Sequence, residues 1–477
     1  MTGSQGDRRR VRTARGRGPI VGIALIALIA LGPAGCAGTP PEPLSERATT
    51  GATAAVDPAA VAEVHTLAEG DVHDPMLAVD RTTDTVYAVW TAQGTDGLDA
   101  DHTGHDQHAA HHHGHAGHEH HVGDPETTSR ILLAVSSDGG RTFSPPVRVD
   151  GPDPVEGFAA DPRSDRPTQV LVTPDAAVHV VWVATRPVEG QPRPANDLRI
   201  ATSRDGGRTF ATPRAVVPTE QAAIWNPGFH RAIVAPDGAI HIAFLATPEE
   251  GGTDGRSVRV ATSRDVGASF QVGEALTTST CQCCPVSMAA NDEGRVTLAW
   301  RHIFWQEDGS PLRDIAVAFS DDGADTWGSL APVHEDGWLM EGCPHTGPAL
   351  ATGPDGRLHV AWYTGREADP GVRYTVEEAP ERFAEPTILA SDGFFPLTQP
   401  SLEVADDGTA WVAWDDLRED EPAIRLGQVT PDGDLVLDDE PLAAGRHPRV
   451  AVTTDTVLVT WANEGRLQVA VLDGTAS

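Results

Sequence analysis

The chain has 477 residues, including 48 Gly and 38 Pro, and a formal net charge of −34 at pH 7. Such an acidic chain lacks the basic face that binds phosphate groups, which argues against nucleic acid or an anionic membrane surface as a partner. The length would suit about three ordinary domains, but repeat folds do not follow that rule.

Residues 1–35 have the pattern of a signal peptide. Basic residues from Arg8 to Arg17 precede the apolar run Ile20–Leu31, which is too short to span a bilayer. The run leads to Ala34-Gly35-Cys36, which resembles a bacterial lipobox, although Pro33 stands where Leu is usual. We therefore predict a lipoprotein signal peptide and a lipidated Cys36. An ordinary secretory peptide cut nearby is the alternative.

Residues 36–60 are predicted to form a flexible tether because they are rich in Ala, Thr, Pro, Glu and Gly. The protein would then be held at the cell membrane only through its lipid, facing the extracytoplasmic side. Residues 61–477 form the remaining domain.

A repeated pattern runs along this domain. A proline is followed by alternating apolar residues, an acidic turn and a β-rich run that ends in an aromatic residue. The aromatic residues are Trp90, Trp182, Phe244, Trp300, Trp362, Trp414 and Trp461. A period of about 50–60 residues is typical of propeller blades. We expect these aromatic side chains to pack between blades.

Each repeat contains four predicted strands, here called A to D, which indicates an all-β propeller of antiparallel blades. Seven blades are predicted, with six as the alternative. The last repeat lacks its strand D, and Val61–Leu67 could supply it and close the ring.

Four copies of a Ser-x-Asp-x-Gly-x-Thr-aromatic pattern join strands C and D. They are residues 136–143, 203–210, 263–270 and 320–327. They resemble the Asp-box, or BNR, repeats of the sialidase-like propeller superfamily, and the resemblance covers residues 61–474. In that family the boxes are structural and lie away from the active face. Function is therefore expected on the opposite face, where the D–A and B–C loops lie.

The longest of these loops, residues 98–123, is rich in histidine. Ten of the 20 histidines of the chain lie between Trp90 and Ile131. Imidazole binds copper, zinc and nickel, so we predict transition-metal ligands here. The predicted ligands are His105, His108, His111, His112, His113, His115, His118, His120 and His121. A pH-responsive or merely low-complexity segment is the alternative.

Two neighbouring D–A loops contain the other cysteines. Cys281, Cys283 and Cys284 precede strand A of the fourth blade, and Cys343 and His345 precede that of the fifth. An oxidising compartment favours disulfides, with Cys343 linking the two blades. The other hypothesis is a thiolate and imidazole site for copper or zinc formed by all five residues.

Polar residues from most blades are predicted to meet at the mouth of the propeller and to bind a metal ion, a small molecule or a glycan. They are His73, Asp74, Arg166, His230, His302, Tyr363 and His447.

We consider three functions. The first is an anchored, monomeric propeller that captures copper or zinc or binds a partner through the metal. The second is a sialidase-like exo-glycoside hydrolase, and the third is an adhesion module without metal. Sialidases need three arginines, a tyrosine nucleophile with a glutamate partner, and an aspartate. Only Tyr363 is expected near the mouth, and no Phe-Arg-Ile-Pro string is present, so no catalytic residue is assigned.

Overall fold

The computed structural model describes residues 61–93, 129–151, 159–161, 166–190, 194–248, 255–340, 342, 344–391, 396, 398–418, 421–438 and 440–473. All of them belong to the second of two compact units of the chain, Ala54–Ser477. The predicted signal peptide and tether, the His-rich loop and Cys343 lie outside the described residues.

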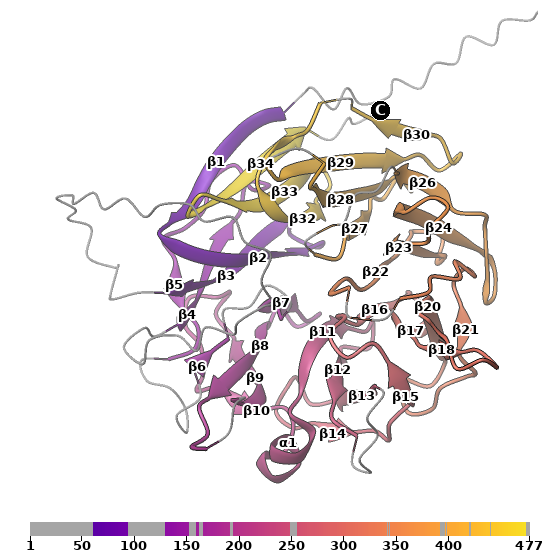
Figure 1. Cartoon of the computed structure of the whole chain (residues 1–477). Coiled ribbons are helices and arrows are strands. Elements are labelled where there is room, and N and C mark those ends of the chain that lie inside the picture. The colour runs from indigo at the N-terminus through magenta and orange to yellow at the C-terminus, as the bar shows by residue number, and fades with distance from the viewer. Residues whose placement is uncertain are drawn as a thin grey trace, which may run out of the picture. The chain divides into compact units, whose positions relative to one another are not determined.

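Seven antiparallel sheets form the blades of a propeller, as predicted (Figure 1). Blade 1 contains β2 (Asp71–Asp80), β3 (Thr85–Gln93), β4 (Ser129–Ser136) and β5 (Val147–Arg148). Blade 2 contains β6 (Ala159–Ala160), β7 (Gln169–Val172), β8 (Val178–Arg186), β9 (Ala195–Ser203) and β10 (Arg214–Ala215). Blade 3 contains β11 (Gly228–Val234), β12 (Ile240–Ala246), β13 (Arg256–Ser263), β14 (Gln271–Val272) and β15 (Thr277–Thr280). Blade 4 contains β16 (Ser287–Ala290), β17 (Val296–Arg301), β20 (Ile315–Ser320) and β21 (Ala331–Pro332).

The remaining three blades follow in chain order. Blade 5 contains β22 (Ala349–Thr352), β23 (Leu358–Thr364), β24 (Gly371–Ala379), β25 (Arg382–Phe383) and β26 (Thr387–Ala390). Blade 6 contains β27 (Ser401–Val404), β28 (Ala410–Asp416), β29 (Ala423–Val429), β30 (Leu435–Leu437) and β31 (Ala443–Ala444). Blade 7 contains β32 (Arg446–Val452), β33 (Thr456–Asn463), β34 (Arg466–Asp473) and β1 (Val61–Glu69).

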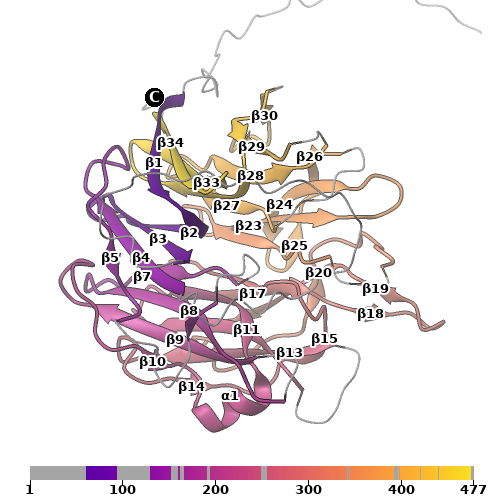
Figure 2. The same ribbon diagram turned by 60° about the vertical axis from the view of Figure 1, so that its left-hand side comes forward.

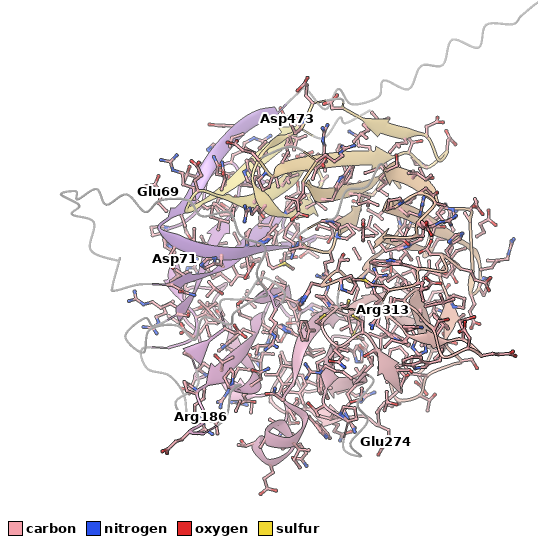
Figure 3. All side chains as sticks on the ribbon, viewed as in Figure 1. Glu69, Asp71, Arg186, Glu274, Arg313 and Asp473 are labelled. Carbon is pink, nitrogen blue, oxygen red and sulfur yellow. The ribbon has the colours of Figure 1, made fainter. Side chains whose placement is uncertain are left out.

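The ring closes through β1, which is the first strand in the chain but the outermost strand of blade 7. β1 runs antiparallel to β34, with Val64 opposite Ala470 and Thr66 opposite Gln468. Figure 3 labels Glu69 and Asp473, which mark the two ends of this strand pair. The predicted closure is therefore confirmed, and it covers the edge of β34 that would otherwise be unpaired.

The core lies between neighbouring blades. Trp90, Trp300, Trp362, Trp414 and Trp461 are each at most 1% exposed. In β28, Val412 and Trp414 pack toward blade 5, whereas Ala413 packs toward blade 7. Because each blade is covered on both faces, its second strand reads as a continuous apolar run rather than an alternating one.

Each Asp-box forms a turn held by its own side chains. In the second copy, Ser203 Oγ donates to Asp205 Oδ1 over 2.7 Å, and Thr209 Oγ1 donates to Asp205 Oδ2 over 2.6 Å. The other three copies repeat this pattern. In the first copy Gly140 has φ +86, and a Cβ there would lie 2.2 Å from Leu458 Cδ2 in β33. The turn therefore needs glycine and packs directly on blade 7.

Two smaller elements depart from the repeat. The hairpin β18 (Phe304–Trp305) and β19 (Pro311–Leu312) leaves blade 4 and extends outward (Figure 2). Helix α1 (Thr219–Trp225) lies between β10 and β11 in the sequence. Within the described ranges, no helix is long and apolar enough to cross a membrane.

Candidate functional site

The D–A loops of all blades enter the innermost strands at one end of the ring. The innermost strands contact one another in turn around the axis. They are β2, β7, β11, β16, β22, β27 and β32. His73 and Asp74 lie in β2, His230 in β11 and His447 in β32, while Arg166 immediately precedes β7. The structure thus places these five predicted mouth residues at the same end of four blades.

Several innermost strands begin with the same backbone distortion. Asp74, Phe229 and His447 have positive φ values of 55°, 55° and 58°. The β-ladder shifts register at each of these places, before it resumes at Met76, Arg231 and Arg449. Asp and His tolerate the left-handed region better than most residues, but for Phe229 it is unfavourable, so the packing of the ring must hold Phe229 in place.

Two of the mouth residues form a contact across the junction between blades 1 and 7. His447 Nδ1 lies 3.6 Å from Asp74 Oδ1, and Asp74 is only 2% exposed. His230 is also buried, and its burial lowers its pKa to about 3, so its ring is neutral at pH 7. His73 instead pairs locally with Asp71, its Nε2 lying 2.6 Å from Asp71 Oδ1.

Arg166 is held by a neighbour on each side. Its Nη1 lies 3.3 Å from Asp161 Oδ2, and its guanidinium lies 4.7 Å from the ring centroid of Phe229. This buried ion pair and cation–π contact join blades 2 and 3. They give Arg166 a structural role at the mouth.

Tyr363, which was expected at the mouth, lies in the apolar core instead. It is 3% exposed and belongs to the cluster between blades 5 and 6, where its ring meets Trp338 edge-on at 5.6 Å. Tyr87 and Tyr374 are buried as well. None of the three tyrosines of the chain is therefore presented to solvent as a sialidase nucleophile would have to be.

His302 is buried and is committed to a hydrogen bond. Trp300 Nε1 donates to His302 Nδ1 over 3.1 Å, which leaves the remaining ring proton on Nε2. Burial lowers the pKa of His302 to about 4. The neutral ring has no lone pair left to offer a metal in this arrangement.

Three cysteines converge in the loop between β15 and β16. Cys284 Sγ lies 2.6 Å from Cys281 Sγ, and the sulfur atoms of Cys281 and Cys283 lie 4.0 Å apart. All three sulfur atoms lie within 4.8 Å of one another. Cys281, Cys283 and Cys284 are 1%, 8% and 2% exposed, so the cluster is nearly shut off from water.

Backbone hydrogen bonds from both sides position this loop. Cys281 N–H donates to the carbonyl oxygen of Arg301 over 2.9 Å, and Val286 N–H donates to that of Phe229 over 3.2 Å. The surrounding apolar cluster includes Val258, Val286 and Trp300. The sulfur atoms are therefore fixed between blades 3 and 4 by atoms that do not depend on a metal.

Arg301 is the charged residue of this region, and the sequence patterns did not single it out. It is 1% exposed, and it donates to the carbonyl oxygens of Thr346, Arg313 and Tyr363 over 3.0, 2.8 and 2.7 Å. Figure 3 labels Arg313 in blade 4. Among the described residues, no carboxylate lies within ion-pair distance of Arg301. Three carbonyl oxygens solvate its charge, and its guanidinium also lies 4.8 Å from the ring centroid of Trp338.

The electrostatics of the cluster follow from burial and from this arginine. Burial raises the pKa of the Cys284 thiol well above its usual value, the thiol of Cys281 adds to the rise, and the Arg301 guanidinium opposes it. The Cys284 thiol therefore stays protonated until something stabilises its thiolate, and a bound metal cation does this most directly.

His345 lies at the matching end of blade 5. It is exposed, has φ +54 and is not among the ligand atoms that converge on the three sulfurs. Of the five predicted Cys and His ligands, the structure thus brings together three, and Cys343 lies outside the described residues. The sequence did contain a signal for Arg301. It directly follows the aromatic residue of strand B, and at this place the other blades have an uncharged residue or an aspartate.

The fold and its four Asp-box turns define the protein as an Asp-box β-propeller. Residues 159–336 match the family described as BNR repeat-like domain, in agreement with the Asp-box repeats found in the sequence. No curated protein sequence matches the chain.

Several solved structures are similar to this chain at low identity. A Hadza microbial sialidase is 13% identical, with 73% of each chain covered and a TM-score of 0.45. An ulvan lyase of a polysaccharide lyase family is 11% identical, with 86% of this chain and 97% of that chain covered and a TM-score of 0.49. An α-L-arabinanase from Penicillium chrysogenum is 17% identical, with 64% and 93% covered and a TM-score of 0.41. At this similarity they carry no argument about activity.

Proposed function

We propose that this protein is a lipid-anchored, extracytoplasmic propeller that captures Cu(I) on the thiolates of Cys281, Cys283 and Cys284. The observation that carries the proposal is the convergence of three buried sulfur atoms beside Arg301, a buried cation with no carboxylate partner in the described residues. Soft thiolate ligands select Cu(I) over harder cations, and the burial of the sulfur atoms excludes water and oxidants.

Charge and ligand number both favour Cu(I) over Zn(II). Three thiolates around Cu(I) carry a net charge of −2, and Arg301 offsets half of it at close range. Zn(II) sites are almost always tetrahedral, and the described residues supply three converging ligands rather than four. On binding, the three thiols would release their protons as the copper–sulfur bonds form.

Two sequence features extend this proposal. The histidines of residues 98–123 would collect copper at the surface of the protein, and lipidated Cys36 would hold it at the membrane. Cys36→Ser should then move the protein from the membrane fraction to the soluble extracytoplasmic fraction. Retention of the variant on membranes would contradict lipid anchoring.

The copper site is tested on the mature chain, produced without a histidine tag and with residues 98–123 deleted so that only the cysteine cluster remains. Cu(I) is titrated anaerobically against a chromophoric chelator, and X-ray absorption reports the ligand atoms. We expect one Cu(I) per chain with sulfur ligands only. Cys281→Ala and Cys284→Ala should each remove this binding.

Val286→Ala is the matched control, because it removes a side chain from the same apolar cluster but no sulfur atom. It should bind Cu(I) as the parent does. Undiminished binding in the Cys281→Ala, Cys284→Ala double variant would refute the site. So would a parent protein that binds Zn(II) but no Cu(I), which would assign the cluster to zinc instead.

A further inference from the structure

Propellers have a central channel along their axis, and in this protein two arginines occupy equivalent places on the innermost strands of blades 3 and 7. They are Arg231 in β11 and Arg449 in β32. In each strand, this arginine is the residue at which regular pairing with the next strand resumes after the backbone distortion. They pair with Ala243 and Thr460 at equivalent positions of blades 3 and 7. β11 and β32 face each other across the ring (Figure 1).

Neither guanidinium has an ion-pair partner. Within the described part of the chain, no carboxylate lies within 4.0 Å of either group. Arg449 is 6% exposed. Its Nε donates to Met76 Sδ over 3.0 Å, and its Nη1 donates to the carbonyl oxygen of Pro448 over 2.8 Å. A thioether is a weak acceptor for a charged donor. The buried Nε of Arg231 has no hydrogen-bond partner among the residues that the structure describes.

Both charges persist at neutral pH. Burial lowers the pKa of Arg449 to about 10, with the charge of Arg231 lowering it further and Asp74 and Asp415 raising it. Burial also lowers the pKa of Arg231, and Glu403 partly offsets this. The two guanidinium groups therefore repel each other, and none of the acidic groups that act on them lies within ion-pair distance in the described residues.

Acidic groups flank this level without neutralising it directly. Glu403, in β27, faces Arg231 and has Arg81 as its ion-pair partner, with Arg81 Nη2 3.9 Å from Glu403 Oε2. On the mouth side, Asp74 Oδ1 is buried and lacks a hydrogen-bond donor in the described residues, since His447 Nδ1 is 3.6 Å away. The Glu403 side chain is 35% exposed, so solvent reaches this part of the channel.

We propose that a single phosphate ion binds in the axial channel between Arg231 and Arg449, with a carboxylate oxygen of Asp74 accepting a hydrogen bond from the phosphate hydroxyl. Guanidinium groups match oxyanions in geometry and charge. Hydrogen phosphate also keeps a proton that it can donate to the unsatisfied Asp74 Oδ1, whereas sulfate has none at neutral pH. The site lies on blades 1, 3 and 7, so it does not depend on the cysteine cluster of blade 4.

The test is calorimetric titration of metal-free mature protein with inorganic phosphate and, separately, with sulfate at matched ionic strength. We expect one phosphate per chain and weaker binding of sulfate. Arg231→Met and Arg449→Met should each weaken phosphate binding about tenfold or more, as loss of a charge-assisted hydrogen bond does. Asp74→Asn should abolish the preference for phosphate over sulfate.

Arg466→Met is the control, because Arg466 is exposed and pairs with Glu69 at the surface. It should bind phosphate as the parent does. Should an arginine variant fail to fold, crystals of the parent soaked in arsenate, which has the charge and shape of phosphate, should show anomalous density between Arg231 and Arg449. A parent protein that binds no phosphate, or arsenate density elsewhere only, would overturn the proposal.

Discussion

Cys281 and Arg301 are joined by a backbone hydrogen bond, in which the N–H of Cys281 donates to the carbonyl oxygen of Arg301 over 2.9 Å. The bond ties the cysteine loop to the end of β17, where the Arg301 side chain turns into the interior. Because the bond uses backbone atoms only, it survives substitution of the Arg301 side chain. The position of the loop and the charge beside it can therefore be varied separately.

Arg301→Met removes the charge and leaves three carbonyl oxygens without their donor. We expect the free energy of unfolding to fall by about 2–4 kcal/mol, because buried partners of a charged group become unsatisfied. Cu(I) affinity should fall at least about tenfold, because the thiolates lose their nearest cation. Denaturant titration and copper competition measure the two effects.

Arg301→Lys separates charge from geometry. The ammonium keeps the positive charge but cannot reproduce the planar fork that reaches three carbonyls. It should recover most of the Cu(I) affinity and less of the stability. Parent-like copper binding by Arg301→Met would show that the arginine is purely structural.

Val266→Gly should stabilise the protein. Val266 occupies the fourth place of the third Asp-box with φ +56, where the other three copies have Gly139, Gly206 and Gly323. A β-branched residue in this region costs about 1–2 kcal/mol, and glycine returns about half of that through the entropy of the unfolded chain. The free energy of unfolding in urea should therefore rise by about 0.5–1 kcal/mol.

Gly206→Val is the reciprocal change at the same place of the second box. Gly206 has φ +74, and nothing lies within 4 Å of a Cβ built there, so the added Cβ meets no neighbour. The loss should be about 1–2 kcal/mol and purely conformational. If neither substitution changed the free energy of unfolding, the backbone of the Asp-box would have to change its conformation to suit the residue at this place.

The sequence repeats made the fold predictable. The proline-to-aromatic pattern occurs seven times and gives the number of blades, and the four Asp-boxes indicate the strand order and the two faces of the ring. Even the closing role of Val61–Leu67 followed from counting strands. The site was predictable only in part. Cys281, Cys283 and Cys284 are adjacent in sequence, and one loop suffices to bring them together.

One common reason explains three failures of the sequence analysis. It placed Tyr363 at the mouth rather than in the core, and it did not single out Arg231 or Arg449. Sequence alternation tells which residues share a face, but in a propeller both faces of a blade are buried. Whether a side chain meets a neighbouring blade or the axial channel depends on how the ring closes. That relation is between segments hundreds of residues apart and leaves no local pattern.

A chain that begins at Gly70 lacks β1 and should lose stability and self-associate. β1 covers β34 along nearly its whole length, and each lost backbone hydrogen bond costs about 1 kcal/mol. The exposed edge of β34 would then pair with other molecules. Light scattering measures the self-association, and thermal unfolding measures the loss of stability. A chain that begins at Val61 is the control. A monomeric, equally stable Gly70 chain would contradict the closing role of β1.

Three histidines in the second strands should make the protein acid-sensitive. His179, His241 and His359 are buried, and burial lowers the pKa of each to about 4 from the ordinary 6.5. The unfolded chain therefore binds protons first as the pH falls, so stability is full above pH 6.5 and declines toward pH 4. Each histidine contributes about 1.4 kcal/mol per pH unit in that window.

His241→Gln isolates one of these contributions. His241 Nδ1 lies 2.9 Å from Thr262 Oγ1, and a glutamine amide can keep this hydrogen bond without titrating. The variant should show a shallower fall of the free energy of unfolding between pH 6.5 and 4, by about 1.4 kcal/mol per pH unit, and the parent's pH dependence above pH 7. Urea titrations across this range measure both slopes. An unchanged slope below pH 6.5 would mean that His241 takes up its proton in the folded protein, so the second strand would have to open locally to admit it.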